Sequence, residues 1–462
     1  MTAISAQLSA SVVHWLAIRF MESIKEFSPS GNGTSLRETS ILSGRFMHRR
    51  EFLSNALRAV VMRSVAPRSA AWVGNPSLGL PALGTSNANS DVGRELDRHR
   101  FGVNYTPSKN WWFCWNEWDA DSIKRDLDSM ASVGADHLRI LLIWPYFQPN
   151  PKWVSPLHLE RLDQLLTLMG ERHLDAVVTV FTGQLSGWYF LPPFNQPGSG
   201  FYSDAGIWKA QEMFIRELAR VISAKDNVIG FDVGNEVNTC WSTEPRLGDA
   251  WMTKMFALMQ EVLPHGLHVN GVDEVPWFEV NTFSPQALAA RPMPVMHCYP
   301  YWSGALKYGG PMGPPSTKLL AAMATLIRSY AGDGTKGDPR KPVWAGEFNT
   351  CIESLPEKQQ AEWLEKAVVA AIESGVSWFS YWDSHDVDRR FDFNPLEYSL
   401  GLFTNDGKIK EQGRAFRRLA DAYRGKPVVF PSQPVPPPPI SRNQETTWRW
   451  MLDWMGWKPR NG

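Results

Sequence analysis

The sequence predicts a single α/β catalytic domain built as a (β/α)8 TIM barrel, and three observations lead to this fold class. From Phe101 the chain alternates short apolar runs with helical patterns, which is typical of parallel α/β folds. Eight such units can be counted, and eight strands close a barrel. The length of 462 residues leaves room for the roughly 250 residues of such a barrel and for appendages at both ends.

Eight apolar runs form the expected strands, and the fifth has the weakest strand pattern. They cover 101–105, 137–143, 175–181, 229–233, 267–272, 294–299, 343–346 and 377–382. Helical patterns lie between them, as in 120–134, where Ile123, Leu127, Met130 and Val133 share one face. The other helices are expected over 157–172, 204–224, 249–263, 316–331, 356–374 and 411–424.

The segment before the barrel contains a candidate export signal over 47–72. Arg49 and Arg50 are followed by x-Phe-Leu, a moderately apolar stretch and a small-residue cleavage site, Ser69-Ala70-Ala71, which together match the twin-arginine pattern. A basic amphipathic helix is the alternative, because arginines interrupt the apolar stretch. We expect an exported protein, periplasmic or extracellular.

The other flanking segments are assigned by composition. Residues 1–46 form an extension of uncertain role in front of the signal, unless translation begins at Met47. Residues 73–98 are rich in Gly, Pro, Ser and Asn and are expected to be a linker to the barrel domain, 99–428. The tail, 429–462, combines a Pro-rich stretch with four Trp residues and is expected to pack on the barrel as an amphipathic helix, although it could instead bind a partner.

The bulk composition argues against several classes of protein. Lys and Arg number 47 and so do Asp and Glu, so the balanced charge disfavours a nucleic-acid partner. No run approaches the roughly 18 apolar residues of a membrane-spanning helix. None of the four cysteines is in a CxxC pair, which disfavours a zinc or thioredoxin-like site and leaves disulfides and buried thiols both open. We expect a monomer without metal or cofactor.

Two glutamates end apolar runs, in Gly234-Asn235-Glu236 and Gly346-Glu347-Phe348. In barrels of this kind the active site lies at the carboxyl ends of the strands, so the fold would bring these side chains to one mouth. Paired carboxylates suit acid/base and nucleophilic chemistry on a sugar. Each glutamate alone could be structural, Glu236 as a helix cap and Glu347 as an ion-pair partner of Arg139.

Further polar and aromatic residues lie at the other strand ends and in the loops beyond them. The polar candidates for substrate binding are Arg139, Asn235, His297 and Tyr299. Among the 22 Trp residues, those in loops can offer an indole face to a pyranose ring, which a core Trp cannot. The aromatic candidates are Trp382, Trp112, Trp144 and Trp188.

With these motifs the chain resembles, over about 101–425, the retaining (β/α)8 β-glycosidases of glycoside hydrolase clan A, in particular the family 5 type of cellulases and mannanases. The resemblance implies that Glu236 is the acid/base, that Glu347 is the nucleophile, and that Asn235 binds the sugar 2-hydroxyl. It also implies that Tyr299 donates a hydrogen bond to the nucleophile. His297, Arg139 and Trp382 match further residues of the family pattern.

One departure leaves the subfamily open, because many family 5 enzymes carry a His after the third strand and this chain has Gln184 nearby in Phe181-Thr-Gly-Gln184. The implied activity is hydrolysis of β-linked oligo- or polysaccharides by double displacement. Arg139 would keep Glu347 ionised, and the approach of the second carboxylate would raise the pKa of Glu236.

Substrate and rival functions stay open at this stage. Aromatic loops after the first and third strands favour β-1,4-mannan over glucan, and they do not decide between endo and exo action or between hydrolysis and transglycosylation. A non-catalytic carbohydrate-binding barrel would not need both glutamates. An aldolase or a phosphate-binding isomerase would need a strand-tip Lys or a Gly-rich phosphate loop, and the eighth strand instead ends in Trp382-Asp-Ser-His.

Overall fold

The computed structural model describes residues 96–332, 336–350, 355–392 and 394–458. The chain divides into two units, Met1–Pro81 and Ala82–Gly462. The first unit lies outside the described residues, as do the predicted export signal and nearly all of the predicted linker. The second unit contains the whole predicted barrel.

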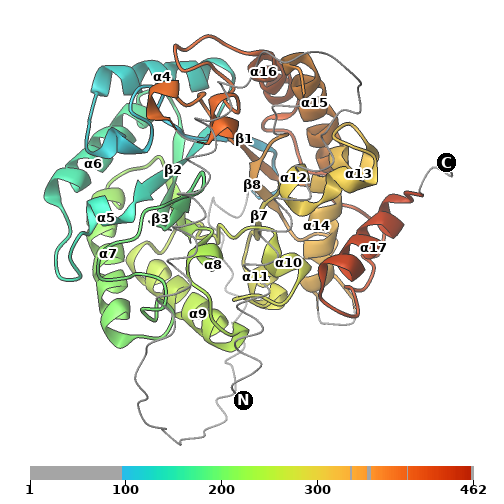
Figure 1. Cartoon of the computed structure of the whole chain (residues 1–462), viewed down its shortest axis with the longest axis horizontal. Coiled ribbons are helices and arrows are strands. Elements are labelled where there is room, and N and C mark those ends of the chain that lie inside the picture. The colour runs from blue at the N-terminus through green and yellow to red at the C-terminus, as the bar shows by residue number, and fades with distance from the viewer. Residues whose placement is uncertain (1–95, 333–335, 351–354, 393, 459–462) are drawn as a thin grey trace, which may run out of the picture. The chain divides into compact units, whose positions relative to one another are not determined.

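Seven parallel strands form one curled sheet in the order β6-β3-β2-β1-β9-β8-β7 (Figure 1). Each central strand is buried over nearly its whole length, as expected when helices cover the outer face and side chains fill the interior. The strands are β1 (Arg100–Asn104), β2 (His137–Ile143), β3 (Asp175–Thr182), β6 (Val228–Asn235), β7 (Val295–His297), β8 (Trp344–Phe348) and β9 (Trp378–Tyr381).

The predicted fifth strand, 267–272, occupies the expected place beside β6 without forming a regular strand. Leu267 N donates to Ile229 O (2.9 Å) and Val269 N to Phe231 O (2.9 Å), and Val233 N donates back to Val269 O (3.0 Å). A separate apolar cluster joins this segment to β3, β7, β8 and β9 across the interior. Its members are Val177, Leu267, Val269, Met293, Val295, Trp344 and Trp378. The architecture is therefore the (β/α)8 fold that the sequence predicts.

Long amphipathic helices surround the sheet (Figure 1), each close to its predicted range. Asp119 begins the first of them by accepting a hydrogen bond from Ser122 N, and Asp204 caps another through Gly206 N and Ile207 N, which satisfies amides that helix starts leave free. The helices are α4 (Ala120–Ser132), α6 (Pro156–Gly170), α7 (Ala205–Ile222), α9 (Pro245–Val262), α14 (Leu319–Tyr330), α15 (Glu357–Glu373) and α16 (Glu411–Tyr423).

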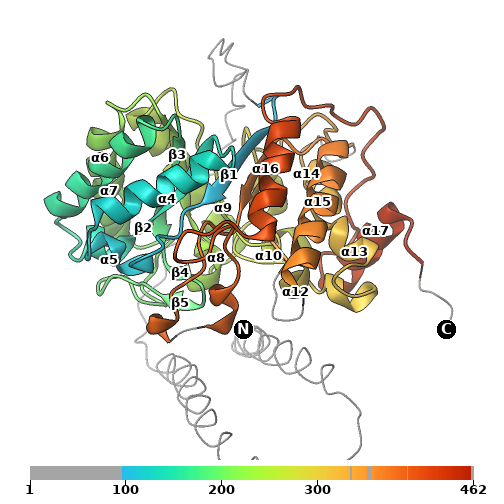
Figure 2. The same cartoon turned by 90° about the horizontal axis from the view of Figure 1, so that it is seen from above.

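Short elements gather at the carboxyl ends of the strands (Figure 2), where the sequence places the site. They include a two-stranded hairpin after β3, two 3-10 turns, and single-turn helices that follow β2, β6, the fifth strand position and β7. They are the hairpin β4 (Gln184–Leu185) and β5 (Trp188–Tyr189), α5 (Trp144–Phe147), α8 (Val237–Cys240), α10 (Val275–Phe278), α12 (Pro300–Ser303), η2 (Trp111–Trp115) and η5 (Pro395–Tyr398).

The tail packs on the barrel through α17 (Gln444–Met455), as predicted. Trp448 is buried, and its Nε1 donates to Ser303 O (2.7 Å), while Thr447 Oγ1 donates to Phe278 O (2.9 Å). The tail therefore holds the loops that follow the fifth and sixth strand positions.

Three of the four cysteines, Cys114, Cys240 and Cys298, are buried free thiols, and Cys351 lies outside the described residues. Within the described part of the chain, no helix combines the length and apolar character that crossing a membrane requires.

Candidate active site

Glu347 ends β8 inside the mouth of the barrel, and only 3% of the residue is exposed. Its Oε1 lies 2.5 Å from Arg139 Nη1, and its Oε2 accepts a hydrogen bond from the Tyr299 hydroxyl at 2.7 Å. Both carboxylate oxygens are thus held, one by a donor from β2 and the other by a donor from the loop after β7. This orientation leaves the Glu347 carboxylate fixed rather than free to rotate.

Glu236 follows β6 in a left-handed backbone conformation (φ 47°, ψ 45°) that is unusual for a residue with a side chain. Its amide donates to Gly271 O at 2.7 Å, which ties this turn to the fifth strand position. Strain of this kind persists only where surrounding contacts impose it, and it concentrates at functional sites. The Glu236 side chain is 17% exposed, so it reaches the surface of the mouth while Glu347 lies deeper.

Arg139 extends from the middle of β2 and organises the floor of the site. Its guanidinium binds Asp232 Oδ2 (2.8 Å from Nε), Asn104 Oδ1 (3.0 Å from Nη1) and Asn235 Oδ1 (2.8 Å from Nη2), in addition to Glu347. The planar fork of an arginine can serve several acceptors at once, and here it joins four strands. The carboxylates of Asp232 and Glu347 compensate the charge of the buried guanidinium.

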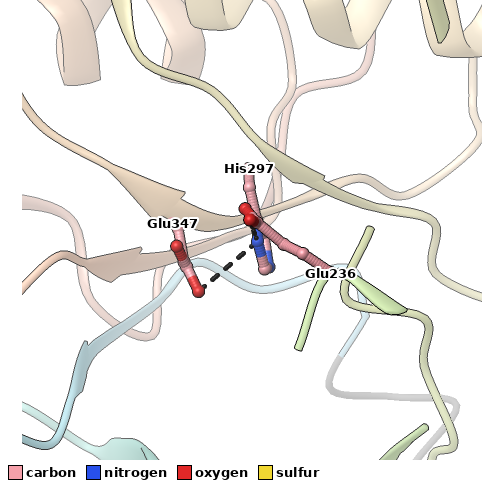
Figure 3. Close-up of side chains that lie close together, drawn as sticks. All are labelled: Glu236, His297 and Glu347. Atoms are coloured by element: carbon pink, nitrogen blue, oxygen red, sulfur yellow. Dashed lines mark hydrogen bonds and ion pairs between the residues drawn. The ribbon is translucent and has the colours of Figure 1, made fainter. Parts of the chain in front are cut away.

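His297, at the end of β7, lies between the two glutamates (Figure 3). Its Nδ1 is 2.9 Å from Glu236 Oε1 and 3.4 Å from Glu347 Oε1. Burial lowers the pKa of His297 to about 4, so the ring is neutral at neutral pH. A neutral imidazole can contact both carboxyl groups without adding a second buried cation beside Arg139.

The two glutamates differ in their electrostatic surroundings. Burial raises the pKa of Glu236 to about 7, and Arg139 opposes this only in part. Burial also raises the pKa of Glu347, and so does the charge of Glu236, whereas His297, Arg139 and the Tyr299 hydroxyl oppose the shift. Arg139 therefore acts on Glu347 in the predicted direction. Burial is the main cause that raises the pKa of Glu236, and the charge interaction between the two glutamates acts on the pKa of Glu347.

The same three side chains offer one nitrogen and two oxygens that all lie within 4.8 Å of one another. A metal ion could use such a set, but both oxygens of Glu347 already accept hydrogen bonds from Arg139 and Tyr299. The guanidinium would also repel a cation at that position. The arrangement fits a pair of reacting carboxyl groups better than a metal centre.

The four tryptophans predicted to bind substrate lie in different environments. Trp382 directly follows β9, where its amide donates to Phe348 O (3.1 Å). Its ring centroid is 6.2 Å from that of Trp112, which is buried and so does not offer its face to solvent as predicted. Trp188 lies on the hairpin and is 43% exposed. Trp144 does not reach the site, because α5 turns it inward. Its Nε1 donates to Gln148 Oε1 (2.8 Å), and its ring packs on Phe181.

Several site residues were not predicted. Asp232 and Asn104 hold Arg139, and the carbonyl oxygen of Gln184 accepts a hydrogen bond from Asn235 Nδ2 (2.8 Å). A charged residue inside the apolar run Ile229–Val233 was a usable signal for Asp232, because an Asp in a barrel interior needs a partner.

Comparison with known proteins identifies relatives only among solved structures. Neither a scan of protein-family models nor a search of curated proteins returned a match. A GH5_18 structure from Streptomyces cattleya in complex with Manβ1-4GlcNAc is 29% identical, with a TM-score of 0.69, over 78% of this chain and 93% of that one. A GH5_18 structure from Bifidobacterium longum subsp. infantis is also 29% identical, with a TM-score of 0.69, over 78% and 91% of the two chains.

A more distant likeness shows the fold alone. The exo-β-1,4-mannosidase Op5Man5 from Opitutaceae bacterium strain TAV5 is 24% identical, with a TM-score of 0.61, over 71% of this chain and 60% of that one. Taken with the GH5_18 structures, these findings confirm the resemblance to family 5 glycoside hydrolase barrels. They also confirm the prediction of an O-glycosyl hydrolase that acts on β-linked glycans.

Proposed function

We propose that the protein is a retaining β-glycosidase that cleaves β-mannosidic bonds by double displacement. The observation that carries this proposal is the pair Glu236 and Glu347, with an oxygen of each carboxyl group within 4.8 Å of the other. Retaining glycosidases hold their carboxyl groups about 5–5.5 Å apart, whereas inverting enzymes need roughly 6.5–9.5 Å to fit a water molecule.

The two environments suit the two roles. Glu347, held by Arg139 and Tyr299, attacks the anomeric carbon, forms the glycosyl-enzyme and releases the leaving-group oxygen. Glu236, whose pKa of about 7 keeps much of it protonated at neutral pH, donates its proton to that oxygen. Glu236 then accepts a proton from the water that displaces Glu347 from the sugar, so that both carboxyl groups return to their starting states.

The choice of mannose rests on similarity. The GH5_18 structure from S. cattleya holds Manβ1-4GlcNAc. Hydrolysis of Manβ1-4GlcNAc or of β-1,4-linked manno-oligosaccharides is therefore the activity that we propose, in preference to β-glucan hydrolysis.

The test is hydrolysis of Manβ1-4GlcNAc, mannotriose, β-mannan, β-glucan, xylan and aryl β-glycosides by wild type, Glu236→Ala and Glu347→Ala. We expect turnover of β-mannosides that Glu347→Ala abolishes and that Glu236→Ala lowers by about 100- to 10,000-fold. Azide should restore turnover to both variants, with opposite stereochemistry. Glu347→Ala would yield the inverted glycosyl azide, and Glu236→Ala would yield the retained one.

A matched control is Glu373→Ala, since Glu373 is an exposed glutamate on α15 and should keep wild-type activity. Turnover that survives in Glu347→Ala would contradict double displacement. Hydrolysis of cello-oligosaccharides in preference to mannosides would contradict the proposed sugar.

Export by the twin-arginine route is a further proposal, supported by Arg49-Arg50 and the residues that follow them. The full chain should be found outside the cytoplasm in a host that carries this pathway. Replacement of both arginines by lysine should retain it inside, and an unchanged distribution would contradict the proposal.

A further inference from the structure

The turn that carries Glu236 needs support, because Glu236 has a left-handed backbone conformation that a residue with a side chain seldom adopts. The single-turn helix α8 begins directly after it, at Val237. A conformation of this kind persists only where neighbouring residues impose it. The contacts that α8 makes with other segments therefore decide where the Glu236 carboxyl group lies.

One of these contacts joins Asn238, the second residue of α8, to Asp273 in the loop after the fifth strand position. Asn238 Nδ2 donates to Asp273 Oδ1 at 2.6 Å. Asn238 is 5% exposed, and its Oδ1 has no hydrogen-bond partner among the described residues. The Asp273 carboxyl group therefore orients the Asn238 amide, since the opposite orientation would turn the amide oxygen toward a carboxyl oxygen.

Asp273 is itself fixed by backbone contacts on either side of it. Its Oδ1 also accepts a hydrogen bond from Val275 N, at the start of α10, at 3.0 Å. Two residues before it, Gly271 O accepts from Glu236 N (2.7 Å), and Gly271 N donates to Asp232 Oδ1 (2.7 Å). This short segment therefore contacts the Glu236 turn at two points and is tied to the floor of the site through Asp232.

We propose that Asp273 is a positioning residue for the acid/base: together with Asn238 it holds the turn that aims Glu236 at the departing oxygen. This inference rests on the proposed function, which assigns Glu236 its role. Asp273 acts through Asn238 and does not need to touch the sugar. Its loss should misplace the Glu236 carboxyl group and leave Glu347 in place, because donors from β2 and from the loop after β7 hold the Glu347 oxygens.

A misplaced acid/base should affect substrates according to their leaving groups. Manβ1-4GlcNAc releases a sugar oxygen that needs a proton, whereas a dinitrophenyl β-mannoside releases an anion that is stable without one. On both substrates Glu236 then acts as base for the water of the second step. A fault in Glu236 alone therefore lowers kcat/KM on the disaccharide and kcat on the dinitrophenyl substrate, and it leaves kcat/KM on the dinitrophenyl substrate unchanged.

The first experiment compares wild type, Asp273→Ala and Asn238→Ala on both substrates. We expect kcat/KM on Manβ1-4GlcNAc to fall about 10- to 100-fold in each variant, since a displacement of about 1 Å is enough for such a loss. On dinitrophenyl β-mannoside, kcat/KM should stay within about threefold of wild type while kcat falls. The double variant should be no worse than either single variant, because each removes the same contact.

The conservative variant Asp273→Asn should retain most of the activity. Burial and the charge of Glu236 raise the pKa of Asp273 to about 7, so its carboxyl group is partly neutral at neutral pH and an amide is a close substitute. The amide oxygen can accept from the same two donors. Asp249→Asn is the matched control, because Asp249, on α9, also accepts a loop hydrogen bond, from Ser284 N at 2.9 Å. Thermal unfolding of each variant shows whether it is folded.

The outcomes separate this inference from the proposed function. Failure of wild type to hydrolyse any β-mannoside would overturn both. Wild-type turnover of Manβ1-4GlcNAc by Asp273→Ala, or an equal loss of kcat/KM on both substrates, would overturn only the role of Asp273. Additive losses in the double variant, or a loss in Asp273→Asn as large as in Asp273→Ala, would also overturn it.

Discussion

Arg139 Nη1 lies 2.5 Å from Glu347 Oε1, and both side chains are excluded from solvent. The pair connects β2 to β8 through the interior of the barrel. A charge buried in this way is stable only while its partner is present. The same contact therefore contributes to the stability of the fold and to the orientation of the proposed nucleophile.

Arg139→Lys tests this double role. Lysine keeps the charge, but it cannot bind Glu347, Asp232, Asn104 and Asn235 together, as the guanidinium does. We expect kcat/KM to fall at least about 100-fold and the free energy of unfolding to fall by ~3 kcal/mol. Arg172→Lys, which alters a surface pair with Asp128, should cost less than about 1 kcal/mol. Near-wild-type turnover in Arg139→Lys would contradict the assigned orientation role.

The pH dependence of kcat/KM should report the two glutamates. Glu236 must be protonated, so activity should fall as the pH rises through about 7. Glu347 must be ionised, and because its pKa is raised, the acid limb should lie above pH 4.5. The measurement is a profile on a substrate with a poor leaving group and another on a dinitrophenyl glycoside, which needs no proton. The alkaline limb should weaken only for the second, and a flat profile for both would contradict the role of Glu236.

The raised pKa of Glu236 also predicts how stability depends on pH. The folded carboxyl group holds its proton more tightly than the unfolded one, so this contribution is complete below pH 4.5 and is lost as the pH rises through about 7. Glutamine at position 236 does not ionise, so Glu236→Gln does not lose this contribution as the pH rises. At pH 8 it should be more stable than wild type by ~2 kcal/mol, with little difference at pH 4. Thermal unfolding at both values measures this, with Glu373→Gln, at an exposed position on α15, as the control.

Most of the fold could be predicted from the alternation of apolar runs and helical patterns along the sequence. Strand β2 has the predicted limits, 137–143, because a continuous apolar run between helical segments leaves few alternatives. The segment 267–272 was harder, since His268 and Asn270 interrupt it and its pairing with β6 is carried by a few backbone hydrogen bonds. Only its position in the sequence, between the clearly predicted strands β6 and β7, identified this segment as the fifth strand.

The residues of the site likewise include some that the sequence predicts and some that it does not. Glu236, Glu347, Arg139, His297 and Tyr299 were predictable because the fold brings strand ends together. Trp144 satisfies the same rule, but a single turn of helix directs its ring into an aromatic cluster, which spacing cannot show.

The tail should contribute measurably to stability through Trp448. This side chain is buried, packs near Phe278 and Tyr308, and donates to Ser303 O. Trp448→Ala should lower the free energy of unfolding by about 3–5 kcal/mol, as for other buried aromatics. Trp450→Ala, in the same helix but only half-buried, should cost clearly less. Equal effects, measured by denaturant unfolding, would show that the tail packs in some other way.

Gly271 offers the sharpest test of how closely the floor of the site is packed. A Cβ atom there would lie 2.6 Å from Asp232 Oδ2 and 2.7 Å from Arg139 Nη2, closer than real contacts allow. Gly271→Ala should therefore displace Arg139, and a displacement of about 1 Å is enough to lower kcat/KM about 100-fold. Gly170→Ala is the matched control, because its Cβ would make only ordinary contacts of 3.5 Å with Asn227. If Gly271→Ala keeps wild-type kcat/KM and thermal stability, Arg139 has more freedom than this packing allows, and its proposed control of Glu347 fails.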